Sequence, residues 1–200
     1  MLKLKMSTQR IQMAEAFRAQ IHELTYGLSL PATPRNRAAG ACFAIAQDHH
    51  AAIVFLLKNT FYSSSYALLR CLFEAYLRGL WLKHCATDLQ LADFINGVEP
   101  PKTMLSEIEA TEVFSSGALS RVKKTSWRTM CAFTHTGGLH LQRWQSPTAI
   151  EPVFETGELE ECLNCAELLG CMSGLELVQM SNTSDNGVAV IDLMKKRWPQ

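Results

Sequence analysis

The stretch "SWRTMCAFTHTGG", residues 126 to 138, holds an arginine and a histidine whose spacing suits phosphate chemistry. Arg128 and His135 lie seven positions apart, which on an α-helix is about 20° short of two turns and about 10.5 Å of rise. Their side chains would therefore share one face, and the glycine pair after them would end the helix. A guanidinium can pair with two phosphate oxygens, and an imidazole can move a proton near neutral pH.

These two groups could together hold and cleave a phosphate, a reaction that needs proton transfer and stabilisation of the negative charge that builds up on the phosphoryl oxygens. His135 is suited to the proton transfers. Arg128 is suited to the developing charge, because it never loses its proton. The competing structural interpretation is that His135 contacts the last carbonyls of its helix while Arg128 pairs with a Glu.

Other combinations of reactive residues are weaker candidates. Arg78 and His84 are six positions apart, so a continuous helix would place them about 120° from each other. Cys131 and His135 resemble a nucleophile and its base, but no third residue is in place to orient them. Cys162 and Cys165 form one C-x-x-C inside a helical pattern, without the second pair that a zinc site needs. The sequence predicts no metal site and no cofactor.

Charge is unevenly distributed around this motif. Positions 113 to 150 contain no Asp or Glu, whereas the helix expected from Glu158 to Ser181 contains Glu but no Lys or Arg. Basic residues interleaved with aromatic rings are typical of single-stranded nucleic-acid sites. The residues that we expect to contact nucleic acid are Lys123, Lys124, Trp127 and Arg143. The alternative is that the basic segment lies against the acidic helix within the fold.

Three charged residues, Arg70, Glu74 and Arg78, recur every four positions in an otherwise apolar stretch. Such a stripe is either an exposed ladder of i,i+4 pairs or a set of ion pairs inside the fold. We name Arg70 and Glu74 as supporting residues, with Glu74 expected to hold Arg128 or to orient His135.

Helical periodicity dominates the sequence, and strand-like alternation is nearly absent. Helices joined by short connections pack as antiparallel neighbours, so we predict an all-α, up-and-down bundle with additional short helices, residues 1–200 forming a single domain. Thr33 is expected to cap the second helix, with Pro34 in its first position. The predicted helices are 7–28, 33–58, 66–86 (beginning after the serines at 63 to 65), 88–96, 102–114, 118–136, 158–181 and a short tail helix ending at Trp198, with a loop over 137–157.

Composition limits the classes of protein that the chain can belong to. Hydrophobic residues make up 48 % of it, charged residues 19 %, and the net charge is zero, so charge alone indicates no partner. Seven cysteines without a disulfide-like framework predict a reducing, cytoplasmic location. No apolar run reaches the length of a membrane span, so we expect none.

The Arg128–His135 pattern resembles the R-x4-6-H signature of the HEPN superfamily, all-helical domains of bacteria and archaea. The segment "SSSYALLRCLFEAYLRGLWL", residues 63–82, also resembles helical families of unknown function related to that superfamily. Thr129 stands where these motifs often place Asn, Asp or His directly after the Arg. The matched stretches cover about a quarter of the chain.

This resemblance implies a metal-independent endoribonuclease that works as a homodimer, uses Arg128 and His135, and leaves a 2′,3′-cyclic phosphate. It also implies a toxin or phage-defence effector, with an antitoxin or effector partner protein. The alternative is a non-catalytic helical bundle that binds a protein partner or nucleic acid.

Overall fold

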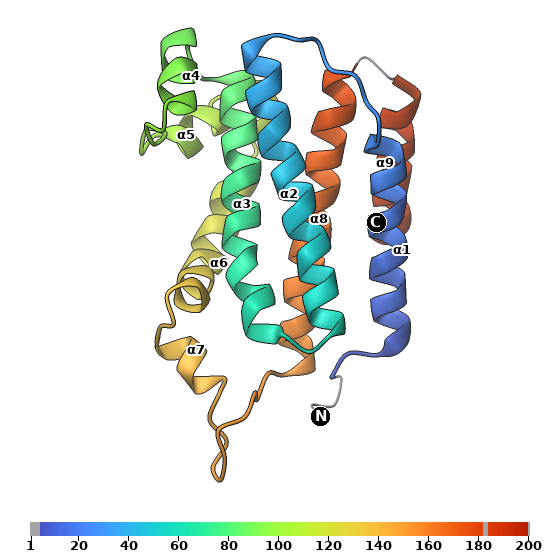
Figure 1. Cartoon of the computed structure of the whole chain (residues 1–200), viewed down its shortest axis with the longest axis vertical. Coiled ribbons are helices and arrows are strands. Elements are labelled where there is room, and N and C mark those ends of the chain that lie inside the picture. Colours follow the sequence, from blue (N-terminus) through green and yellow to red (C-terminus); the bar gives the residue numbers. More distant parts are fainter. Residues whose placement is uncertain (1–4, 182–183, 200) are drawn as a thin grey trace.

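The computed structural model describes residues 5–181 and 184–199. Within these ranges the chain forms nine α-helices, one short 3-10 helix and no β-strand, which confirms the predicted all-α fold. The long helices stand side by side and alternate in direction along the chain, with α6 on the flank of α3 (Figure 1). They are α1 (Thr8–Thr25), α2 (Pro34–Lys58), α3 (Tyr62–His84), α6 (Ala118–Thr134), α8 (Thr156–Met180) and α9 (Ser184–Arg197).

Short helices fill the two connections on either side of α6. The first connection lies beside one end of α3, and the second contains α7 inside the stretch predicted to be a loop (Figure 1). The loop prediction is therefore wrong over those residues. The short elements are α4 (Asp88–Ile95), α5 (Met104–Glu109), η1 (Glu112–Phe114) and α7 (Gly138–Gln142).

Two helix starts show how local chemistry sets the boundaries. Thr33 accepts a hydrogen bond from the Asn36 amide at 3.1 Å, and Pro34 follows it as predicted. The prediction that the third helix begins after the serines is wrong, because α3 already begins at Tyr62. Ser65 is buried in its first turns, and its hydroxyl donates to the Tyr62 carbonyl at 2.6 Å. The Ser65 hydroxyl, a group that often favours a loop, thus has its hydrogen bond inside the helix.

The core lies where α2 packs against α3 and α8. Phe43 of α2 is fully buried over Gly79 of α3, which leaves room for the ring by having no side chain. Helix α2 is long and apolar enough to cross a membrane by length and composition, as the core helices of soluble proteins also are. The absence of a membrane span stays a prediction.

Replacing Gly79 with alanine should destabilise the fold. A methyl group there would lie 2.5 Å from Cε1 of Phe43, so the ring must shift within a packed core. We expect a loss of about 1–3 kcal/mol in the free energy of unfolding, despite the better helix propensity of alanine. Chemical denaturation would measure it, with Gly157→Ala as control, because a methyl group there meets open space. Equal stability of the two variants would contradict this packing.

A buried carboxylate joins both ends of the chain to α8. Glu167 is fully buried and accepts hydrogen bonds from Arg10 of α1 and Arg197 of α9, each at 2.9 Å. Asn164, one turn earlier, accepts from both arginines as well. Two guanidinium groups against one carboxylate satisfy a charge that could not be buried alone.

His50 of α2 is a buried base. It is fully buried against Gly170 of α8, and neither ring nitrogen has a hydrogen-bond partner among the described residues. Burial lowers the pKa of His50 from 6.5 to about 4, partly offset by the nearby Glu167 and reinforced by Arg18. The folded protein therefore holds this ring neutral where the unfolded chain would protonate it.

This burial predicts a pH-dependent stability. The folded pKa lies below the unfolded one, so the stability present at pH 7 is lost as the pH falls from 6.5 to about 4. The loss should reach about 3 kcal/mol, because each pKa unit corresponds to 1.36 kcal/mol. Denaturation of wild type and His50→Leu at several pH values would measure it. Carboxylates whose pKa is lowered in the folded protein, such as Glu158 and Glu176, reduce the stability only as the pH falls below about 4.5. If the free energy of unfolding of wild type and of His50→Leu changed equally with pH above about 4.5, the prediction would be contradicted.

Candidate nucleic-acid interface

The outward face of α6 carries a row of exposed cations. Arg121, Lys124 and Arg128 are all exposed, and their spacing of three and four residues places them within about 60° on one side of the helix. None of them forms an ion pair with a described residue, and α6 itself contains no Asp or Glu. Among the described residues, the Arg121 side chain donates only to the Ser116 carbonyl, at 2.6 Å. The row is therefore positively charged and open to solvent.

Helix α6 ends one residue before His135, two residues earlier than predicted. His135 is the C-cap, Thr136 adopts a left-handed φ of 53°, and the Gly137 amide donates to the Ala132 carbonyl at 2.7 Å. This is a Schellman ending with threonine in the position that glycine usually takes. Gly137 is needed for a different reason, since a side chain there would lie 3.2 Å from Cα of Ala132. Gly137 alone thus allows the close backbone approach at the end of the helix, since a side chain at Gly138 would meet open space.

His135 is exposed at this helix end and contacts an arginine of α3. Nη1 of Arg70 lies 2.6 Å from Nε2 of His135. A guanidinium has no acceptor, so Nε2 must accept, which leaves this imidazole neutral with its proton on Nδ1. The Nε2 lone pair, which would have to take a proton in catalysis, is occupied by the hydrogen bond from Arg70.

Arg70 is held from three sides. Its Nε donates to Glu74 at 2.8 Å, and this hydrogen bond raises the pKa of the Arg70 guanidinium. The same guanidinium lies 4.9 Å from the centre of the Trp127 ring, which Lys123 approaches from 5.2 Å. Both supporting residues thus lie at the end of α6, with His135 and Trp127. Glu74 reaches His135 only through Arg70 and makes no ion pair with Arg128.

The remaining basic candidate lies elsewhere. Arg143 follows α7, and its Nε donates to both carboxylate oxygens of Glu158 at 3.0 Å. This contact raises the pKa of Arg143 and lowers that of Glu158, against the opposing effect of burial. Arg143 is therefore neutralised by the acidic helix, as the structural interpretation of the basic segment expected, whereas Lys124 and Arg128 are not.

Sequence reasoning missed Arg121 as the first residue of the cationic row. The signal was present, since Arg121, Lys124 and Arg128 follow the three- and four-residue spacing of one helix face. The contact between Arg70 and His135 had no such signal, because it joins residues 65 positions apart. Three groups for phosphate chemistry therefore lie on or beside α6: a neutral imidazole, a neighbouring guanidinium and an exposed cationic row.

Comparison with known proteins yields a family but no activity. No curated protein and no solved structure matches the chain. A family model described as "Family of unknown function (DUF6988)" matches residues 43–197. This range includes α3, the cationic row and His135, and also the buried His50 with Gly170, against which it packs. The chain belongs to this DUF6988 family of unknown function.

Proposed function

We propose that the protein is a HEPN-like, metal-independent endoribonuclease whose site is the outward face of α6. The observation that carries the proposal is the row of unpaired cations leading to His135, whose imidazole is neutral and lies against Arg70. The resemblance to the R-x4-6-H signature agrees with it. Arg128 and His135 remain the proposed catalytic pair, with Arg70 and Glu74 as supporting residues.

Binding would begin with the phosphates. Arg121, Lys124 and Arg128 span about two turns, roughly 10 Å, which is long enough to contact successive phosphates of a single strand. Trp127 offers a ring edge next to this row, although Arg70 and Lys123 already cover part of it. The carboxyl end of α6 disfavours phosphate, so the side-chain cations must supply the attraction.

Cleavage would require Arg70 to release His135. A phosphate that draws the Arg70 guanidinium toward itself frees Nε2, which can then take the 2′-hydroxyl proton as the oxygen attacks phosphorus. The His135 imidazolium then gives this proton to the leaving 5′-oxygen, and the products are a 2′,3′-cyclic phosphate and a free 5′-hydroxyl. Arg128 and Arg70 stabilise the phosphoryl charge.

Two copies of the chain fit this chemistry better than one. Arg128 and His135 are separated by about 10 Å of helix rise, which one long arginine side chain spans only in part. We therefore propose a homodimer in which two α6 ends face one RNA, acting in the cytoplasm as a toxin or defence effector restrained by a partner protein. All seven cysteines are free thiols, which is compatible with a reducing compartment.

A non-catalytic RNA-binding role is the second candidate. It is favoured by the hydrogen bond between Arg70 and His135, because that bond occupies the nitrogen that catalysis would need. This alternative predicts salt-dependent RNA binding by the same cationic row without strand cleavage.

Incubation of the purified protein with labelled single-stranded RNA in EDTA tests the proposal. Cleavage that leaves a cyclic-phosphate end, and that disappears when the RNA carries a 2′-deoxy sugar at the cleaved nucleotide, would support it. Binding without cleavage would favour the second candidate. RNA that is neither bound nor cleaved would contradict both.

A further inference from the structure

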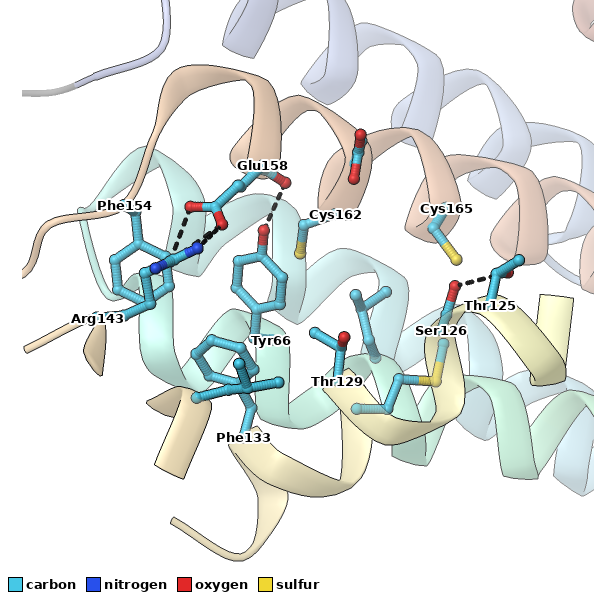
Figure 2. Close-up of a pocket in the computed structure, with 14 residues that line it drawn as sticks. Tyr66, Thr125, Ser126, Thr129, Phe133, Arg143, Phe154, Glu158, Cys162 and Cys165 are labelled. Atoms are coloured by element: carbon cyan, nitrogen blue, oxygen red, sulfur yellow. Dashed lines mark hydrogen bonds and ion pairs between the residues drawn. The ribbon is translucent and has the colours of Figure 1, made fainter. Parts of the chain in front are cut away.

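A pocket of about 250 Å³ separates α6 from α8, on the side of α6 opposite to the cationic row. Helix α6 packs on α3 and α7, and in the described chain it makes no comparable packing against α8. Figure 2 shows side chains of α3, α6 and α8 directed into the space between them. The pocket thus occupies a place where a bundle would ordinarily have helix-to-helix contact.

One wall of the pocket is aromatic and fixed in position. The Tyr66 and Phe133 rings stack at 4.5 Å between centres, and Phe154 lies 5.6 Å from Tyr66. The Tyr66 hydroxyl donates to the Glu158 carbonyl at 2.5 Å, which holds the ring in place. Figure 2 shows this group at one end of the pocket. The ring faces pack on one another and the three side chains are almost fully buried, so the wall offers ring edges, which suit the face of a flat aromatic ligand.

The opposite end is polar but carries no available positive charge. Thr129 of α6 lines the pocket, and its hydroxyl makes no hydrogen bond to a described residue. Cys165 of α8 also lines it, and burial raises the pKa of this thiol to about 11, so it stays neutral. Glu161 is exposed at the pocket and has no ion pair with the described residues, whereas Arg143 is held by Glu158. The free groups are therefore hydroxyl, thiol and carboxylate.

We propose that this pocket binds a small planar aromatic molecule with N–H donors, neutral or positively charged, of nucleobase size. The ring edges would contact its face, Thr129 would accept a hydrogen bond from it, and Glu161 would favour a positive charge. Anionic ligands are disfavoured, because their charge would meet Glu161 without a compensating cation. The site lies across α6 from Arg128 and His135, so this proposal is independent of RNA cleavage.

Two probes of equal shape and opposite charge test the proposal. Benzamidine and benzoate are titrated into the ¹⁵N-labelled protein, with adenine as a neutral heterocycle, and amide chemical shifts report the site. We expect benzamidine and adenine to shift amides of α6 and α8, and benzoate to bind at least about tenfold more weakly. Absence of binding at millimolar benzamidine and adenine, or equal binding of benzoate, would overturn the proposal.

Two variants test where the ligand binds and how much the charge of Glu161 contributes to its affinity. Thr129→Leu fills the pocket with a good helix former and should weaken both ligands at least about tenfold. Glu161→Gln should weaken benzamidine about fivefold and leave adenine unchanged, with Glu112→Gln, at an exposed carboxylate outside the pocket, as matched control. Unchanged binding in Thr129→Leu would place the ligand elsewhere and refute the assignment.

The natural ligand could be a free heterocycle or an unpaired base of a bound nucleic acid. Single-stranded RNA containing 2-aminopurine distinguishes these sources. Fluorescence quenching that is lost in Thr129→Leu and blocked by adenine identifies an RNA base. If adenine binds but the fluorescence of the RNA does not change, the natural ligand is a free heterocycle. Either result supports the proposed pocket.

Discussion

RNA cleavage by the His135→Ala variant should be about 100- to 10,000-fold slower than by the wild type, with RNA affinity almost unchanged. The magnitude is that of a lost proton-transfer group. Affinity is expected to survive because a neutral imidazole contributes no charge to phosphate binding, while Arg121, Lys124 and Arg128 remain. Single-turnover cleavage and equilibrium binding, measured on the same RNA in EDTA, would separate the two effects.

Arg128→Ala provides the complementary result, since it removes a phosphate contact as well as transition-state stabilisation. Its cleavage should fall about 100- to 1,000-fold, and the dependence of binding on salt should weaken by about one phosphate contact. Arg37→Ala is the matched control, because Arg37 is likewise exposed and lies on α2 outside the cationic row. Cleavage that persists in both His135→Ala and Arg128→Ala would refute the proposed site.

Glu167→Leu should cost about 3–5 kcal/mol of the free energy of unfolding. The substitution leaves the guanidinium groups of Arg10 and Arg197, whose side chains are only 12 % and 18 % exposed, without their shared carboxylate. Arg10 would keep Glu160, and both arginines would keep Asn164. Arg197, however, would lose its ion pair in these half-buried surroundings, which is strongly destabilising. Urea denaturation with circular dichroism would measure the loss.

Two further variants identify the cause of this loss. Glu167→Gln keeps the shape and an acceptor, so its loss should be smaller, and the difference from leucine reports the value of the hydrogen bonds. Glu160→Gln removes a half-buried partner of Arg10 and should cost about 1 kcal/mol or less. A loss below 1 kcal/mol in Glu167→Leu would show that the buried carboxylate is not what holds the chain ends.

The sequence predicted the helices well wherever the signal was local. Thr33 and Pro34 mark a helix start by their own chemistry, and the structure begins α2 at that point. The start of α3 was missed because Ser65 satisfies its hydroxyl within the helix, which composition alone does not reveal. Helix α7 was missed because five residues carry too little periodicity to separate a helix from a loop.

The candidate site was predictable only in part, for a similar reason. The spacing of Arg128 and His135 predicts a shared helix face, whereas in the structure α6 ends at Thr134 and His135 is its C-cap. The contact between Arg70 and His135, and the ion pair that removes Arg143 from the row, depend on how α3, α6 and α8 pack together. Such pairings join distant parts of the chain, so hydrophobic periodicity and motif spacing do not encode them.

The buried carboxylate of α8 also has a consequence for how the chain opens. Glu167 pairs with Arg10 near one end of the chain and with Arg197 near the other. When either terminal helix detaches, Glu167 loses one of its two guanidinium partners, and the ion pair that holds the other terminal helix changes. The amides of α1 and α9 should therefore exchange with deuterium at a common rate, as one cooperative unit. A protease that acts on one end of this protein would in effect loosen the other.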